Sequence, residues 1–199
     1  MAMDKKIPLM VASTVYGYQD QLSAINATIE TLGNYRIVNS HKGTVKVDPT
    51  KSNMDNCLQA VRDCDVFLGI IRPYYGTGNI GDQNITFEEM KLAIELKKPY
   101  WFLVHRDVTF ARQLLNKAYC RDRPEERQKN IYIKKSPLFD SRTLDVYDYV
   151  IKHGKPVTLR TGNWAQEYWR LSEALEYVIT QFEDEQFVRD IVVRRKAEQ

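Results

Sequence analysis

The 199-residue sequence lacks several features that would place it in a familiar class of protein. It has no apolar run close to the ~20 residues of a membrane-spanning helix, and its N-terminus has no apolar core like that of a signal peptide. We therefore expect a cytoplasmic protein without membrane contact. The net charge of +3 is too small to indicate a nucleic-acid partner, and the only basic cluster is residues 194–196.

Metal-binding and nucleophilic patterns are also missing. Cys57, Cys64 and Cys120 are odd in number and lack the close pairing of a zinc site or a thioredoxin-like motif. Helical spacing places Cys57 and Cys64 on one apolar helix face, which predicts structural thiols. The three histidines are scattered. The sequence supports neither a metal site nor a Ser-His-Asp arrangement, although residues distant in the sequence can converge in a fold.

No glycine-rich phosphate loop is present, because neither the Rossmann fingerprint nor a Walker motif can be found. If a nucleotide binds, other groups must hold its phosphates.

What the sequence does contain is an alternation of short apolar runs with amphipathic helices, which is typical of a parallel sheet covered on both faces. Predicted strands cover residues 7–12, 36–38, 65–71 and 100–104, with 131–133 as a further candidate and 156–159 as a last, edge strand. Predicted helices cover residues 19–32, 53–64, 86–96, 110–115 and 143–152, and a final helix begins near Trp164. We expect one three-layer α/β domain over residues 1–182, with a mostly parallel five-stranded sheet. A helical tail over 183–199 is then available for a partner or another subunit.

Glu89 is the candidate catalytic residue. On a helical wheel, Phe87, Met90 and Ala93 share an apolar stripe, Glu89 falls at its edge, and Glu88 falls nearly opposite. Glu89 should therefore be half sheltered, and a partly desolvated carboxyl group that faces a cleft can take part in chemistry. The alternative is that both glutamates are ordinary first-turn residues, favoured by the helix dipole and following Thr86 as the N-cap.

Ligands of such sheets bind at the carboxyl ends of the strands, so the segments after the first and third strands are candidates for a nucleotide site. Ser13 and Thr14 carry hydroxyl groups suited to a phosphate or a ribose, and Arg72 carries a guanidinium suited to a phosphate. Tyrosine rings suited to stacking on a base belong to Tyr16, Tyr74 and Tyr75. The alternative is that the tyrosines pack in the core.

Several short segments of the first half of the chain together resemble a known family. These segments are Val11–Tyr16, Cys57, Cys64-Asp65, Gly69–Ile71, Tyr75-Gly76, Ile85-Thr86 with Glu89 and Ala93, and Lys98-Pro99. They are similar to the TIR-like domain of unknown function found at the front of some STAND NTPases and in bacterial defence loci. The resemblance implies a flavodoxin-like fold related to TIR domains and nucleoside deoxyribosyltransferases.

The resemblance also implies an activity. In catalytic relatives a glutamate on this helix, four residues before a small residue, acts on the N-glycosidic bond of NAD or a nucleoside, and Glu89 matches it, with Ser13 closing the first strand. The tryptophan that accompanies this glutamate in many TIR domains is absent. We expect an NAD-consuming N-glycosidase that depletes nucleotide in defence or signalling, takes NAD as substrate, needs no cofactor and acts as a homo-oligomer or with a protein partner. The alternatives are a non-catalytic TIR-like module that binds a protein or a nucleotide signal, and a deoxyribosyltransferase-like enzyme.

Overall fold

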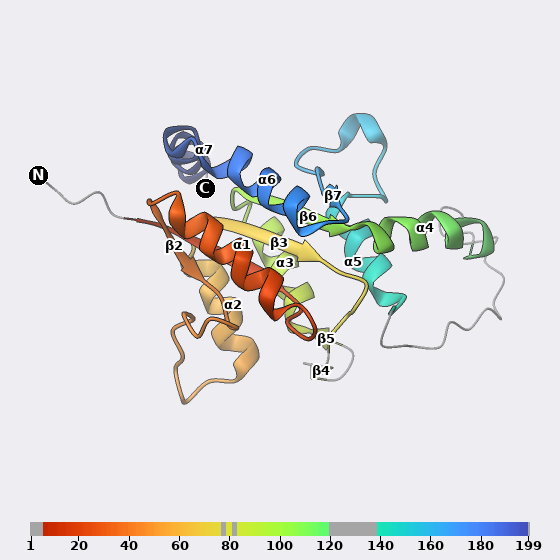
Figure 1. Ribbon diagram of the computed structural model, residues 1–199, viewed down its shortest axis with the longest axis horizontal. Helices are drawn as coiled ribbons and strands as arrows, with labels where there is room; N and C mark the ends of the chain where they lie inside the picture. The colour runs from red at the N-terminus through yellow and green to blue at the C-terminus, as the bar shows by residue number, and fades with distance from the viewer. Residues whose placement is uncertain (1–5, 77–78, 81–82, 120–138, 199) are drawn as a thin grey trace, which may run out of the picture.

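The computed structural model describes residues 6–76, 79–80, 83–119 and 139–198, and five of its strands form one sheet. The strands lie in the order β2-β1-β3-β6-β7 (Figure 1). Their bounds are β1 Ile7–Ser13, β2 Tyr35–Val38, β3 Val66–Ile71, β6 Tyr100–His105 and β7 Gln166–Tyr168. The predicted α/β class with a five-stranded sheet is confirmed, and every pairing within the sheet is parallel.

Each face of the sheet has its own hydrophobic core, because successive side chains of a strand point to opposite faces. In β1, Leu9 and Val11 belong to the first core, whereas Met10 and Ala12 belong to the second. The first core is covered by α1 (Gln19–Thr31), α6 (Leu171–Phe182) and α7 (Glu185–Ala197). The second is covered by α2 (Asn53–Asp63), α3 (Ile85–Glu95), α4 (Arg106–Tyr119) and α5 (Arg142–Val150), which gives three layers (Figure 1).

The sequence prediction of an edge strand at residues 156–159 is wrong. Val157–Leu159 forms a short 3-10 helix in which both end residues are exposed. The strand beside β6 is instead β7, in which Tyr168 is buried and Gln166 and Glu167 are polar. An edge strand covered on one face needs few apolar side chains, so its pattern is easily missed.

The end of the chain also differs from the prediction. The helix expected to begin near Trp164 begins at Leu171, because β7 occupies the residues before it. The predicted tail contains helix α7, which buries Val188 and Val192 in the first core. The candidate strand at 131–133 lies outside the described residues. In the described part of the chain, no helix has both the length and the apolar character that a membrane crossing needs.

The strand order places a topological switch point at β1. Its two neighbours are β2, which follows it in the chain, and β3, which lies on its other side. The chain connections therefore diverge at the carboxyl ends of β1 and β3. In open parallel sheets, a crevice forms at this position, and ligands bind there. A two-stranded antiparallel ladder, β4 (Asn79–Ile80) with β5 (Gln83–Asn84), precedes α3 near this edge.

Candidate functional site

A cavity of about 440 Å³ lies at the switch point, in the size range of small-molecule sites. Its walls come from the segments that follow β1, β2 and β3 and from helices α2 and α3. The lining residues are Ser13, Thr14, Val15, Tyr16, Ser40, Gly43, Val45, Val47, Asn53, Asn56, Cys57, Tyr74, Gly76, Asn84, Ile85, Thr86 and Glu89. Hydroxyl, amide and apolar groups therefore surround a single carboxyl group in the described lining.

Glu89 reaches the cavity because of the way α3 begins and packs. Asn84, not Thr86 as the sequence suggested, is the N-cap, and its side-chain oxygen accepts from the backbone N–H of Phe87 at 3.1 Å. Met90 is buried against the sheet, and Glu89 beside it is 5% exposed, deeper than the half-sheltered position expected from the wheel. Glu88, expected to be solvated, has a side chain that is 24% exposed and pairs with Lys91 at 2.7 Å.

The surroundings of Glu89 favour its neutral form. Burial raises the pKa of Glu89 to about 8, and a hydrogen bond from the Cys57 thiol opposes part of that rise. Among the described residues no cation is paired with this carboxyl group. Glu89 is therefore mostly protonated at neutral pH in the absence of ligand, and no ion pair closes it off from the cavity.

The ends of β1 and β3 are tied together beside Glu89. The buried Ser13 hydroxyl donates to the carbonyl of Thr14 at 3.2 Å, and the Thr14 hydroxyl donates to the carbonyl of Tyr74 at 3.0 Å. The rings of Tyr16 and Tyr74 lie 5.4 Å apart between centroids and are tilted by 35°. Tyr16 is 69% exposed, so this aromatic pair stands where the cavity meets solvent.

Two of the side chains proposed from the sequence do not line this cavity. The Arg72 guanidinium donates to the carbonyls of Thr14 and Tyr16, both at 3.0 Å, and lies 4.1 Å from the ring centre of Tyr18. Arg72 thus fixes the segment after β1, and a phosphate would compete with these carbonyls for it. Tyr75 is buried beneath the Arg142 guanidinium, 4.2 Å from its ring centre.

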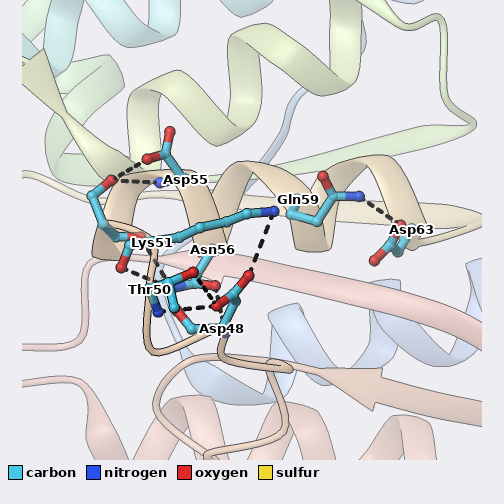
Figure 2. A network of polar contacts seen from close by, with 8 residues as sticks. Asp48, Thr50, Lys51, Asp55, Asn56, Gln59 and Asp63 are labelled. Carbon is cyan, nitrogen blue, oxygen red and sulfur yellow. Dashed lines mark hydrogen bonds and ion pairs between the residues drawn. The ribbon is translucent and has the colours of Figure 1, made fainter.

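Sequence reasoning missed the amide side chains that shape the cavity. Buried Asn56 accepts from the backbone N–H of Asp48 at 2.8 Å and donates to the carbonyls of Asp48 and Ser52, both at 3.1 Å. Figure 2 shows how this network joins the loop before α2 to the helix, where the Ser52 hydroxyl caps the N–H of Asp55 at 3.0 Å. The Ser52 cap could be found from the sequence, but the pairing of Asn56 with the loop could not.

Gly76 permits a close approach on the opposite wall. It has φ of +92°, and a Cβ there would meet the Thr14 side chain at 3.0 Å and the Asn84 amide at 3.1 Å. A larger residue would push these two side chains apart.

The residues that line this cavity lie in a part of the chain that matches a known family model. The model of a family described as "Domain of unknown function (DUF4062)" matches residues 8–148. This chain belongs to that family. The DUF4062 match includes the whole cavity lining and β1 to α3, whereas β7, α6 and α7 follow it. The kinship of this DUF4062 domain with TIR domains stays a prediction.

No curated protein matches this chain significantly. A solved structure that it resembles is "Structure of Clostridium botulinum CMP N-glycosidase, BcmB", with 12% sequence identity and a TM-score of 0.46. The alignment covers 86% of this chain and 97% of that one.

Proposed function

We propose that this chain cleaves an N-glycosidic bond of a nucleotide at the Glu89 cavity, with NAD as the substrate. The proposal depends on one observation. A buried carboxyl group, which no described cation pairs with, lines a ligand-sized cavity at the switch point of the sheet. Strongly shifted acids in clefts are typical of functional sites. The hydroxyl groups of Ser13 and Thr14 beside it suit a ribose, and the Tyr16–Tyr74 pair suits a base.

In the proposed reaction, the bond between ribose C1′ and the nicotinamide nitrogen breaks. Both bonding electrons leave with nicotinamide, which becomes neutral and needs no proton. The ribosyl centre is positively charged until water adds to C1′ and releases a proton to solvent. Ionised Glu89 stabilises this charge, and the interaction is strong because the site is desolvated. The products are nicotinamide and ADP-ribose.

The raised pKa of Glu89 sets the expected pH dependence. The carboxylate is the active form, so kcat/KM should fall by about tenfold per unit as pH drops below about 8 and level off above it. The positively charged nicotinamide ring of bound NAD favours the ionised carboxylate. The corresponding limb of kcat should therefore lie at a lower pH.

The test is release of nicotinamide from NAD, followed at several protein concentrations because the chain is expected to act as a homo-oligomer or with a protein partner. Glu89→Gln should reduce the rate by a factor of about 100 or more, since it removes the charge that acts in the transition state. Glu88→Gln is the matched control and should change the rate less than about twofold. Equal activity of the two variants would remove Glu89 from the mechanism.

A second function is favoured by the protonated state of Glu89. A neutral carboxyl group both donates and accepts hydrogen bonds, so it can hold a nucleotide signal without taking part in chemistry. Calorimetry with NAD, nucleosides and nucleotides distinguishes the two functions. Saturable binding that Glu89→Gln weakens, with no product after long incubation, would establish the binding module. Exchange of bases between deoxynucleosides would instead point to a transferase.

A further inference from the structure

A second cavity, here called the β6–β7 cavity, lies where β6 and β7 form the edge of the sheet and has a volume of about 650 Å³. Its described lining comes from the start of β6, the loop that joins α5 to β7, β7 itself and one side of α6 (Figure 1). No described residue lines both this cavity and the Glu89 cavity. Apart from Tyr100 and Trp101, the lining follows the DUF4062 match in the chain. The β6–β7 cavity is therefore a separate feature, built mainly by residues beyond that match.

The cavity exists because β7 is shorter than β6. The pairing of the two strands begins at Leu103 with Gln166, so no residue of β7 lies opposite Tyr100 or Trp101. Gly162 lets the loop before β7 approach this open part of β6, since a Cβ at its φ of +60° would lie 2.5 Å from the Tyr100 hydroxyl. The loop and α6 therefore enclose a space beside β6 that β7 does not fill.

Helix α6 has two distinct sides. Ala174, Val178 and Phe182 are buried in the first core. The residues of α6 that line the cavity recur at intervals of three and four, which places them together on another side of the helix. They are Glu173, Glu176, Tyr177, Thr180 and Gln181. The spacing of residues in α6 therefore provides both a core side and a side that faces the cavity.

Aromatic rings form much of the lining. They belong to Tyr100, Trp101, Trp164 and Tyr177. The indole N–H of Trp101 donates to the Gln181 side chain at 2.9 Å, and that of Trp164 donates to the Gln166 side chain at 3.3 Å. Both N–H groups are thus satisfied within the protein, so a ligand meets the rings themselves. Trp164 is 71% exposed, and most of its surface is therefore available to a ligand.

The charge of the lining is negative. Its charged side chains are Glu167, Glu173 and Glu176, and the described lining contains no lysine, arginine or histidine. Glu167 accepts from the Thr109 hydroxyl. Glu173 accepts from the backbone N–H of Trp169 at 2.7 Å, at the start of α6. The Glu176 carboxylate has no hydrogen-bond or ion-pair partner among the described residues, so it is the carboxylate that is free to pair with a ligand.

Basic side chains also act on residues of the lining without lining the cavity themselves. The Lys152 ammonium donates to the Tyr100 hydroxyl at 3.3 Å. The guanidinium groups of Arg106 and Arg170 lie 4.9 and 5.8 Å from the ring centre of Trp169. Each of these cations therefore has contacts of its own, and in the described part of the chain none of the three is paired with the free carboxylate.

We propose that the β6–β7 cavity binds an organic cation, with the charged group against Glu176 and the rings of Trp164 and Tyr177. Ammonium and guanidinium groups are attracted both to carboxylates and to the faces of aromatic rings, and tryptophan provides the strongest of these faces. A volume of about 650 Å³ is in the range of small-molecule sites. The negative lining disfavours anions such as NAD, so this ligand differs from the one proposed for the Glu89 cavity. The inference does not depend on the proposed function.

Calorimetry on the full chain tests this site with two cations, acetyl-arginine amide and choline. Each has an uncharged counterpart of nearly the same shape, which is acetyl-citrulline amide for the first and 3,3-dimethyl-1-butanol for the second. We expect saturable binding of a cation that exceeds the affinity of its counterpart by at least about tenfold. The cation that binds more tightly identifies the ligand group as a guanidinium or a quaternary ammonium. NAD turnover is not a readout, so failure of the proposed function would leave this result unaffected.

Substitutions and fluorescence place the binding in the cavity. Glu176→Gln should weaken cation binding by about fivefold and Trp164→Ala by about tenfold, whereas Glu183→Gln, an exposed acid outside the lining, is the matched control and should not change it. The chain has three tryptophans, and in Trp169→Phe the two that remain both line the cavity. Their fluorescence should change with the calorimetric midpoint. Binding of neither cation, equal affinity for charged and uncharged forms, or unchanged affinity in both Glu176→Gln and Trp164→Ala would overturn the proposal.

Discussion

Glu89 contributes a free energy to folding that changes with pH. Burial raises its pKa from 4.5 to about 8, so between these pH values the folded chain retains a proton that the unfolded chain has released. The stability from this group is present below pH 4.5 and is lost as pH rises through 8. The slope is about 1.4 kcal/mol per pH unit, and the whole window amounts to roughly 5 kcal/mol.

Replacing this acid by a neutral isostere should therefore stabilise the protein at high pH. We expect Glu89→Gln to unfold at nearly the wild-type urea concentration at pH 5 and to be more stable by about 3–5 kcal/mol at pH 8. Urea denaturation at both pH values measures the difference. Glu88→Gln is the control at the neighbouring position, where the side chain is 24% exposed and pairs with Lys91. A Glu89→Gln effect that is the same at pH 5 and pH 8 would contradict a raised pKa.

The orientation of the Glu89 helix could be predicted from the sequence. The spacing of Phe87, Met90 and Ala93 fixes its apolar face, with Glu89 at the edge of that face and Glu88 nearly opposite it. The contact with Cys57 could not be predicted, because it depends on how two helices pack. Arg72 illustrates the same limit, since only the fold shows that two carbonyls occupy its donors.

At the scale of elements, the start of α3 determines where Glu89 lies. Asn84 caps the helix through Phe87, and its amide also donates to the carbonyl of Tyr75, which joins the end of β3 to α3. The sequence also offered Thr86 as a cap. A threonine and an asparagine are both good N-caps, so the choice depends on the chain path before the helix and not on local preference.

Loss of this cap should loosen the first turn of α3 and the wall of the cavity. Asn84→Ala is expected to lower the free energy of unfolding by about 1–2 kcal/mol and to weaken binding of any ligand that contacts Glu89. Thr86→Ala is the control within the same turn and should have a smaller effect on stability. Urea denaturation and ligand titration measure the two quantities, and equal destabilisation by both variants would be inconsistent with Asn84 as the cap.

Strand prediction succeeded for β1 and β3, which are buried on both faces and form continuous apolar runs. It failed for β7, whose place at the sheet edge leaves Gln166 and Glu167 polar, and it chose instead the apolar residues Val157 and Leu159, which are exposed. Edge strands are defined by pairing with a neighbour, and that information is not local.

At the scale of the whole molecule, the two faces of the sheet are covered by different helices, and the helices that line the Glu89 cavity belong to one face. The cavity lies beside α2 and α3, which pack in the second core, whereas α7 packs in the first. The DUF4062 match ends before α6 and α7, and neither helix contributes a residue to the described lining of the Glu89 cavity. Stability and ligand binding should therefore respond differently to changes in α7.

Val188 and Val193 provide a matched pair on this helix, because Val188 is fully buried and Val193 is 66% exposed. Val188→Ala should reduce the free energy of unfolding by about 1–3 kcal/mol, whereas Val193→Ala should change it by less than about 0.5 kcal/mol. Neither variant should alter ligand affinity at temperatures well below unfolding. Thermal melts and titrations check both points, and a loss of affinity with Val188→Ala would show that the two faces are coupled.

In the proposed function, a nucleotide places its ribose against Glu89. The most direct measurement is a crystal structure of Glu89→Gln soaked with NAD, since that variant keeps the shape of the site while slowing cleavage. We expect a ribose in the 440 Å³ cavity, within hydrogen-bond distance of residue 89 and beside Ser13 and Tyr74. NAD bound elsewhere on the protein, or an empty cavity at a concentration that saturates binding in solution, would contradict it.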